Sequence, residues 1–347
     1  MSEGRSDVLD GAIAPSDNSA LFGHEEAQAF LAAGYRSGKG HHAILIEGPE
    51  GIGKATLAFR FANHILSHPE PADAPAEMAD PDPGSVVSRQ IAAGSSHNVL
   101  HLTRPVDEKT GKVKSAITVD EVRRAGRFFA QTSGTGNWRI VIIDPADDLN
   151  RNAANAILKI LEEPPKRSMF LVLTHTPGRL LPTIRSRCLP LALRPLADAD
   201  MARALAHLDI RLEGERGARV LAAAKGSVSE ALKLVNYGGL DIIDAFDHML
   251  GHPDDAPARR EMHKLGDILA AKDSDTIFDF FATLVARHVN AQAKAAGLGG
   301  DLAAAERFAR LSSELSERLT VADAYNLDRR QTVLSILDDL RTAGAVV

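Results

Sequence analysis

The run GPEGIGKAT at residues 48–56 has the spacing of a phosphate-binding loop but lacks one of its chemical groups. In such loops the glycines let backbone N–H groups turn toward phosphate oxygens, and the lysine adds a positive charge near the outer phosphates. The residues that match the pattern are Gly48, Gly51, Gly53 and Lys54. Ala55 stands where a hydroxyl normally holds Mg²⁺, and the hydroxyl of Thr56 would point about 100° further round a helix. The loop therefore predicts a degenerate ATP site.

A second candidate site residue is Asp144, which ends the run RIVIID. At the carboxyl end of a buried strand, an aspartate of a P-loop hydrolase assists the Mg²⁺. Pro145 follows, where hydrolysing proteins of this layout carry a glutamate, so no general base can act from that position. Asp147 and Asp148 are alternative acids, but the local pattern favours a helix-entry cluster before Asn150.

Two arginines flank a serine in the run PTIRSRC at residues 182–188. Arginine keeps its proton and binds phosphate through a planar fork, so Arg185 or Arg187 is suited to neutralising charge during phosphoryl transfer. An arginine in a loop is, however, most often a solvated surface residue.

The sequence pattern from residue 21 to 195 predicts a fold that could position these residues. Short apolar runs alternate there with helical patterns, which predicts a parallel sheet covered by helices. The predicted strands begin at Ala43, Val99, Arg139, Met169 and Leu189. The phosphate loop follows the first strand and opens a helix, the context that the motif requires.

Beyond Pro195 the strand signals stop and helical periodicity continues to the end of the chain. We expect an α/β P-loop module, then a small helical lid, then an all-helical domain. The expected bounds are 1–195 for the module, with a flexible start at 1–20 and a mobile proline-rich surface insertion at 67–85, then 196–238 for the lid and 239–347 for the last domain.

Composition limits the class of protein. With 44% hydrophobic and 25% charged residues the chain is globular, and its single cysteine, Cys188, fits a reducing cytoplasm and excludes an intramolecular disulfide. The start lacks the basic and apolar segments of a signal peptide, and no run is long enough to span a membrane. The net charge of −6 gives no global reason to bind nucleic acid directly.

Several runs together carry a resemblance to a known family: GPEGIGK, IVIIDPAD, NAANAILKILEEPP, LLPTIRSRC and YNLDRRQTVL. The chain resembles the clamp-loader branch of the AAA+ family over nearly its whole length, and within it the delta-prime subunits of bacterial DNA polymerase III. The resemblance implies an AAA+ module, a lid and a helical collar. It also implies assembly with the ATPase subunits and the delta subunit into a pentameric ring of the polymerase holoenzyme, which meets the sliding clamp and primer-template DNA.

The resemblance further implies roles for single residues. In that family the arginine of an SRC triplet reaches the ATP of a neighbouring subunit, and here the triplet is Ser186, Arg187 and Cys188. Delta-prime subunits are also the members whose own ATP site has decayed. Ala55, Pro145 and Ser229, the last at the place of a lid arginine that senses the γ-phosphate, fit this. We expect no ATPase activity of its own, no required cofactor, and weak ATP or ADP binding.

Three other interpretations make different predictions. An active AAA+ ATPase would use Lys54 and Asp144, and a purely structural adaptor would leave Arg187 paired with surface acids. A direct DNA-binding regulator is disfavoured because no basic stripe interleaved with aromatic residues is present. Many relatives carry a four-cysteine zinc module after the phosphate loop, whereas residues 67–85 contain no cysteine, so no zinc is expected.

Overall fold

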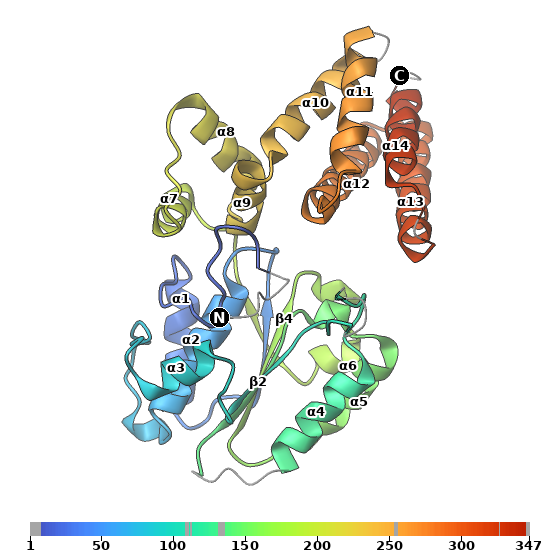
Figure 1. Ribbon diagram of the computed structural model, residues 1–347. Coiled ribbons are helices and arrows are strands. Elements are labelled where there is room, and N and C mark those ends of the chain that lie inside the picture. The colour runs from blue at the N-terminus through green and yellow to red at the C-terminus, as the bar shows by residue number, and fades with distance from the viewer. Residues whose placement is uncertain are drawn as a thin grey trace. The chain divides into compact units, whose positions relative to one another are not determined.

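The architecture is taken from a computed structural model, which describes residues 8–107, 111, 113–130, 136–252, 256–325 and 327–344. The chain divides into two compact units, residues 1–231 and 232–347, which are described separately. The first unit is built around a β-sheet and the second consists of helices (Figure 1). The three-part division expected from the sequence is finer and stays a prediction.

One parallel sheet forms the centre of the first unit. In the described part of the chain its strands are β1 (Ala43–Glu47), β2 (Val99–Leu102), β3 (Arg139–Ile143), β4 (Ser168–Thr174) and β5 (Leu189–Ala192). They lie in the order β2-β3-β4-β1-β5, and every neighbouring pair is parallel. Each strand begins within one residue of its predicted start. Because all carboxyl ends meet at one edge, the residues after β1, β3 and β4 become neighbours.

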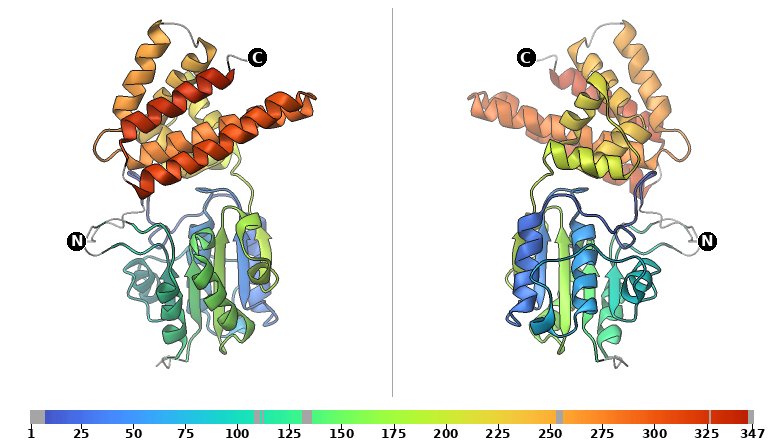
Figure 2. Two further views of the ribbon diagram at one scale, coloured as in Figure 1. Left: turned by 90° about the vertical axis from the view of Figure 1, so that its right-hand side faces the viewer. Right: turned by 90° about the vertical axis from the view of Figure 1, so that its left-hand side faces the viewer.

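Helices cover both faces of this sheet, giving three layers (Figure 2). One face packs against α1 (Glu25–Arg36), α2 (Lys54–Ser67) and α3 (Val86–Ala92), and the other against α4 (Val119–Ala130), α5 (Arg151–Glu162) and α6 (Pro182–Arg185). Alternate strand residues serve the two cores: Ile44, Ile46, Ile140 and Ile142 face the first, and Leu45, Val141, Ile143 and Phe170 the second. The period of two explains why these strands are apolar throughout.

Three short helices follow the last strand. They are α7 (Asp198–His207), α8 (Gly214–Ala224) and α9 (Val228–Asn236), and they occupy the stretch predicted as the helical lid. Helix α9 crosses the boundary between the two units. Short 3₁₀ helices lie in connections of the first unit: η1 (Pro71–Asp73), η2 (Ala146–Asp148) and η3 (Pro177–Arg179).

Over its described residues the second unit is helical, as the helical periodicity beyond Pro195 predicts. Its helices are α10 (Gly239–Gly251), α11 (Ala256–Leu269), α12 (Asp275–Leu298), α13 (Leu302–Ala324) and α14 (Arg329–Gly344). Its core includes Phe246, Phe280, Phe281, Leu315 and Leu337, all buried. The fold class predicted from the sequence, an α/β module with a parallel sheet followed by helical regions, is confirmed.

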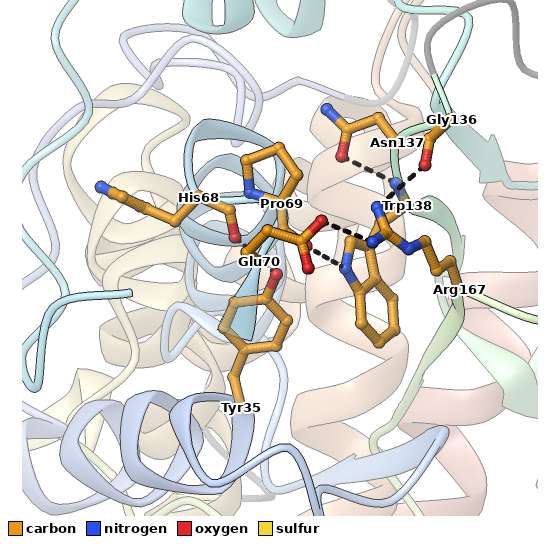
Figure 3. A network of polar contacts seen from close by, with 8 residues as sticks. All are labelled: Tyr35, His68, Pro69, Glu70, Gly136, Asn137, Trp138 and Arg167. Atoms are coloured by element: carbon orange, nitrogen blue, oxygen red, sulfur yellow. Dashed lines mark hydrogen bonds and ion pairs between the residues drawn. The ribbon is translucent and has the colours of Figure 1, made fainter. Parts of the chain in front are cut away.

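The insertion at residues 67–85 differs from the expectation of a mobile segment. Its first residues are held by side chains from distant parts of the chain (Figure 3). The Tyr35 hydroxyl donates to the carbonyl of His68 at 2.6 Å, and Trp138 Nε1 donates to the carbonyl of Pro69 at 2.9 Å. Glu70 pairs with Arg167 at 2.5 Å.

Further along, the same insertion contributes to the core. Ala74 and Met78 are buried against the first face of the sheet, where α2 lies. Arg60, a buried residue of α2, donates to the carbonyl of Met78 at 3.3 Å and pairs with Asp80 at 2.6 Å. Local composition predicted mobility because prolines and acids disfavour regular structure, whereas the contacts that hold this segment come from elsewhere in the chain.

The start of the chain was also expected to be flexible over residues 1–20. Residues 1–7 lie outside the described residues. In the described remainder, the carbonyl of Ser19 accepts a 3.2 Å hydrogen bond from Arg60. One arginine of α2 therefore holds both the end of this starting segment and the insertion.

Candidate functional site

The phosphate loop connects β1 to α2 at the carboxyl edge of the sheet. Its residue Gly53 directly precedes α2 in the left-handed region, at φ 100°, without a side-chain cap. Uncapped N–H groups at a helix start favour an anion. The loop therefore has the backbone arrangement that the GPEGIGK pattern predicts.

Lys54 is folded onto its own loop. The residue is only 4% exposed, and Nζ donates to the carbonyls of Gly48 at 2.7 Å and Pro49 at 2.5 Å. Burial lowers the pKa of Lys54 to about 8, against the opposing effect of the nearby carboxylates of Asp144 and Glu50. A phosphate entering the loop would have to replace these two carbonyls as partners of the ammonium.

The start of α9 contacts two further carbonyls of the loop. Ser227 Oγ donates to the carbonyl of Glu50 at 2.9 Å, and the N–H of Val228 donates to the carbonyl of Gly51 at 2.9 Å. Gly51 has φ +74°, and a Cβ at this position would lie 2.5 Å from the Cβ of Ser229. Ser229, predicted at the place of a lid arginine, therefore lies directly against the loop.

Asp144 lies at the end of β3 as expected. Its Oδ2 is 3.4 Å from Nε2 of His101, which comes from the neighbouring strand β2. Pro145 follows and precedes η2, whose Ala146 is buried. Ala55, the other altered position, packs partly buried against the core beneath α2.

Asp147 has a structural task that the sequence did not reveal. Its carboxylate accepts hydrogen bonds from the Thr174 hydroxyl at 3.0 Å, from the N–H of His175 at 2.7 Å and from the N–H of Thr176 at 3.0 Å. These contacts fix the turn that follows β4. Asp147 is thus occupied as an acceptor, which disfavours it as a substitute general base.

The expected helix-entry role belongs to Asn150, whose side chain accepts from the N–H of Ala153 at 2.9 Å at the start of α5. Asp148 pairs with Nε of Arg104 at 3.2 Å. Burial raises the pKa of Asp148, and Arg104 opposes that effect.

His175 is a member of this site that the sequence analysis missed. It follows β4, and its pKa is lowered by burial and by Lys54, while Glu50, Asp147 and Asp144 act in the opposite direction. Among the described residues its Nδ1 has no hydrogen-bond partner. The signal available in the sequence was position, because His175 directly follows a predicted strand at the edge that carries the phosphate loop.

Arg187 belongs to a different group of residues. It follows α6, and its guanidinium donates to the carbonyl of Thr183 at 2.8 Å and pairs with Glu162, the last residue of α5, at 2.5 Å. About a third of its side chain is exposed. Ser186 is exposed, whereas Cys188 is buried and burial raises the pKa of its thiol to about 11, which disfavours a nucleophilic thiolate.

The described residues contain no cluster of three or more His, Cys, Asp or Glu side chains suited to a metal ion. Within the same described residues, no helix has the length and apolar character needed to cross a membrane.

Comparison with known families decides the relationship of the chain. Residues 23–197 match the family described as "DNA polymerase III, delta subunit", which is half of the chain and includes the phosphate loop, Asp144 and Arg187. The chain belongs to this family. The match ends just before α7, so it covers the sheet and its flanking helices.

Two individual proteins named as delta-prime subunits of DNA polymerase III are also similar to this chain. The chain is 40% identical over 147 residues to "DNA polymerase III subunit delta'" of Pseudomonas aeruginosa, covering 42% of this chain and 41% of that protein. It is 33% identical over 193 residues to the protein of the same name in Bacillus subtilis, covering 56% of this chain and 53% of that one. The chain thus spans about half the length of these relatives.

Solved structures show a more distant likeness. A DNA polymerase III gamma subunit-related protein from Thermotoga maritima is 16% identical, covers 93% of this chain and all of its own, and superposes with a TM-score of 0.45. RuvB from Thermotoga maritima is also 16% identical, with 80% of each chain covered and a TM-score of 0.42.

Proposed function

We propose that this protein is the delta-prime subunit of a bacterial DNA polymerase III clamp loader. The observation that carries the proposal is the family match over residues 23–197, together with 40% identity to a protein named as that subunit. On this proposal the chain works in the cytoplasm with the ATPase subunits and the delta subunit in a pentameric ring. It reaches the sliding clamp and primer-template DNA through that complex.

We infer that the chain does not hydrolyse ATP itself. A P-loop hydrolase needs a hydroxyl on the metal and an acid or amide that orients water, and Ala55 and Pro145 offer neither. The nearby acid Asp147 already accepts three hydrogen bonds. Ser229 lies against Gly51 where hydrolysing relatives are expected to carry a lid arginine.

The loop fits a phosphate better than it fits a metal. Its glycines and the uncapped start of α2 suit an anion, but Lys54 would first have to leave the carbonyls of Gly48 and Pro49. ATP or ADP binding is therefore expected to be weak and not required for the role. No zinc is required either.

Turnover by the isolated protein tests this part of the proposal. Purified chain with ATP and Mg²⁺ should release phosphate at the background rate, and Lys54→Ala should not change that rate. Turnover above background that Lys54→Ala abolishes would establish the alternative, an active AAA+ ATPase. A positive nucleotide-binding assay alone does not contradict the proposal.

The second part of the proposal is that Arg187 acts on the ATP of a neighbouring subunit. Its position supports this, because the guanidinium lies partly exposed beyond α6. Its contacts are with Glu162, Thr183 and Ser186, none of which belongs to the chain's own phosphate loop. The planar fork of arginine suits a phosphate that is gaining charge.

Reconstitution with the other loader subunits tests the arginine. Arg187→Ala should preserve assembly and lower clamp- and DNA-stimulated ATP hydrolysis, because an arginine finger contributes on the order of 10³ to 10⁵ at a single site. The whole complex should lose less, since other sites remain. Arg187→Lys should restore little, and Arg185→Ala, at a nearby exposed position, should have a smaller effect. A wild-type rate for Arg187→Ala would favour the purely structural adaptor.

A further inference from the structure

The guanidinium of Arg187 is held between the ends of two helices. One terminal nitrogen donates to the carbonyl of Thr183 in α6 at 2.8 Å, and the other pairs with Oε1 of Glu162 at 2.5 Å. Thr183 offers one of the carbonyls that the end of a short helix leaves without a helical partner. Glu162 is the last residue of α5, before Pro164 and Pro165. Both anchors are therefore fixed to secondary structure.

This ion pair contributes little to folding. The side chain of Glu162 is 49% exposed and that of Arg187 is 32% exposed, so solvent screens their attraction. Its effect on geometry is larger, because two contacts on different nitrogens fix both the position and the plane of the guanidinium. A single contact would leave the group free to rotate about it.

The held guanidinium still has donors to offer. Each terminal nitrogen carries two hydrogens: one nitrogen donates to the carbonyl of Thr183 at 2.8 Å and to Oγ of Ser186 at 3.4 Å, and the other pairs with Glu162. Nε of Arg187 is buried and, among the described residues, has no partner. The second hydrogen of the nitrogen that pairs with Glu162 can donate to a phosphate oxygen while both anchors stay in place.

We propose that Glu162 is the positioning residue of Arg187, holding the guanidinium in the plane in which it meets the nucleotide phosphate of a neighbouring subunit. This inference rests on the proposed role of Arg187 and adds a residue to it. A group that acts in the transition state must be held close to its productive geometry, and a displacement of about 1 Å can cost on the order of 10² in rate. The carboxylate of Glu162 supplies that restraint before the neighbour arrives.

The opposite effect, in which Glu162 masks the arginine, predicts a different result. A carboxylate beside the guanidinium also lowers the positive charge that a phosphate experiences. If masking dominated, removing Glu162 would raise the rate of ATP hydrolysis. If positioning dominates, removing it lowers the rate.

The test uses the reconstituted loader with wild-type partner subunits and measures kcat and KM for clamp- and DNA-stimulated ATP hydrolysis. Glu162→Ala should lower kcat several-fold with little change in KM, because the lost restraint matters in the transition state. Glu162→Gln should retain most of the rate, since its amide oxygen reaches the same donor. Glu162→Asp keeps the charge but withdraws it by one methylene and should be slow. Glu163→Gln, at the exposed neighbouring position, is the control and should match the wild type.

A double-mutant cycle separates positioning from a general structural role. In an Arg187→Ala background, Glu162→Ala should have no further effect, because Glu162 acts only through that arginine. Wild-type kinetics or a faster rate for Glu162→Ala, with Arg187→Ala still slow, would overturn the positioning role and leave the proposed function intact. If Arg187→Ala itself runs at the wild-type rate, the proposed finger and this inference both fail. Should Glu162→Ala not assemble, the contrast between Glu162→Gln and Glu162→Asp decides.

Discussion

Ser227 and Glu50 are 177 positions apart in the chain, yet the Ser227 hydroxyl donates a 2.9 Å hydrogen bond to the carbonyl of Glu50. This contact fastens the start of α9 to the phosphate loop. The adjacent bond from the N–H of Val228 to the carbonyl of Gly51 does the same with backbone groups alone. Close packing at this junction requires a residue without a side chain at position 51.

Replacing Gly51 by alanine should therefore destabilise the first unit more than an ordinary glycine substitution. The new Cβ would collide with Ser227 Oγ and lie 2.5 Å from the Cβ of Ser229, and the backbone has φ +74°. Gly38→Ala is the matched control, since φ is +65° there and no described atom lies within 4 Å of the added Cβ. Urea denaturation should show a loss of about 2–4 kcal/mol for Gly51→Ala against about 1 kcal/mol for Gly38→Ala. Equal losses of stability in the two variants would show that the contacts between α9 and the phosphate loop rearrange to accept the new Cβ.

The insertion at residues 67–85 should resist proteolysis in the native protein. Arg60 secures it through the carbonyl of Met78 and the carboxylate of Asp80. Arg60→Met removes these contacts, so cleavage by a glutamate-specific protease at Glu77 should become several-fold faster. Arg36→Met, at an exposed position of α1, should leave the cleavage rate unchanged. Rapid cleavage of the wild type would restore the expectation of a mobile segment.

The sequence predicts features that depend on residues within one segment, but it does not predict contacts between distant segments. The strands beginning at Ala43 and Arg139 were evident because buried parallel strands are apolar on both faces. The phosphate loop was evident from its spacing. By contrast, Asp147 looked like a helix-entry acid, and only the fold shows it accepting hydrogen bonds from the turn at His175. Contacts between distant segments leave no periodicity in the sequence.

The same limit applied to the surroundings of Arg187. Glu162 lies in the run NAANAILKILEEPP and Arg187 in the separate run LLPTIRSRC, and nothing in the sequence indicates that the two side chains meet. Their pairing follows from α5 and α6 packing on the same face of the sheet, as their shared core shows. The resemblance of the SRC triplet singled out Arg187, whereas its contact with Glu162 becomes visible only in the three-dimensional structure.

His64 should make the stability of the protein depend on pH. Its side chain is 5% exposed, and its Nε2 has no hydrogen-bond partner among the described residues. Burial, with a smaller effect of the neighbouring His68, lowers the pKa of His64 from 6.5 to about 4. Between these values the unfolded chain binds a proton that the folded chain excludes, so stability falls as pH decreases from 6.5 toward 4.

The ring of His64 lies against those of Tyr35 and Phe61, so His64→Phe keeps a ring there and removes the titration. A shift of this size corresponds to about 3 kcal/mol in full, of which about 2 kcal/mol is lost between pH 7 and pH 4.5, so the loss of stability over this interval should be smaller in the variant by about 2 kcal/mol. Urea denaturation at several pH values measures it. His97→Phe, at an exposed position, should retain the full pH dependence. If His64→Phe has the same pH profile as the wild type, the neutral state of His64 is not what limits stability in acid.

The second unit should be required for joining the loader. Three large apolar side chains at its helix ends are mostly exposed, namely Leu298 at 81%, Leu302 at 75% and Tyr325 at 75%. Leu298 and Leu302 flank the connection between α12 and α13, and neighbouring exposed apolar side chains of this kind favour contact with another protein. Because α9 ends at Asn236, a chain cut after Tyr237 keeps that helix whole and removes α10 to α14. The shortened chain should retain cooperative unfolding of its first unit but no longer co-purify with the other subunits.

Full-length Arg187→Ala, which should assemble normally, is the control. Co-purification of the shortened chain at wild-type yield would place the assembly surface on the first unit instead.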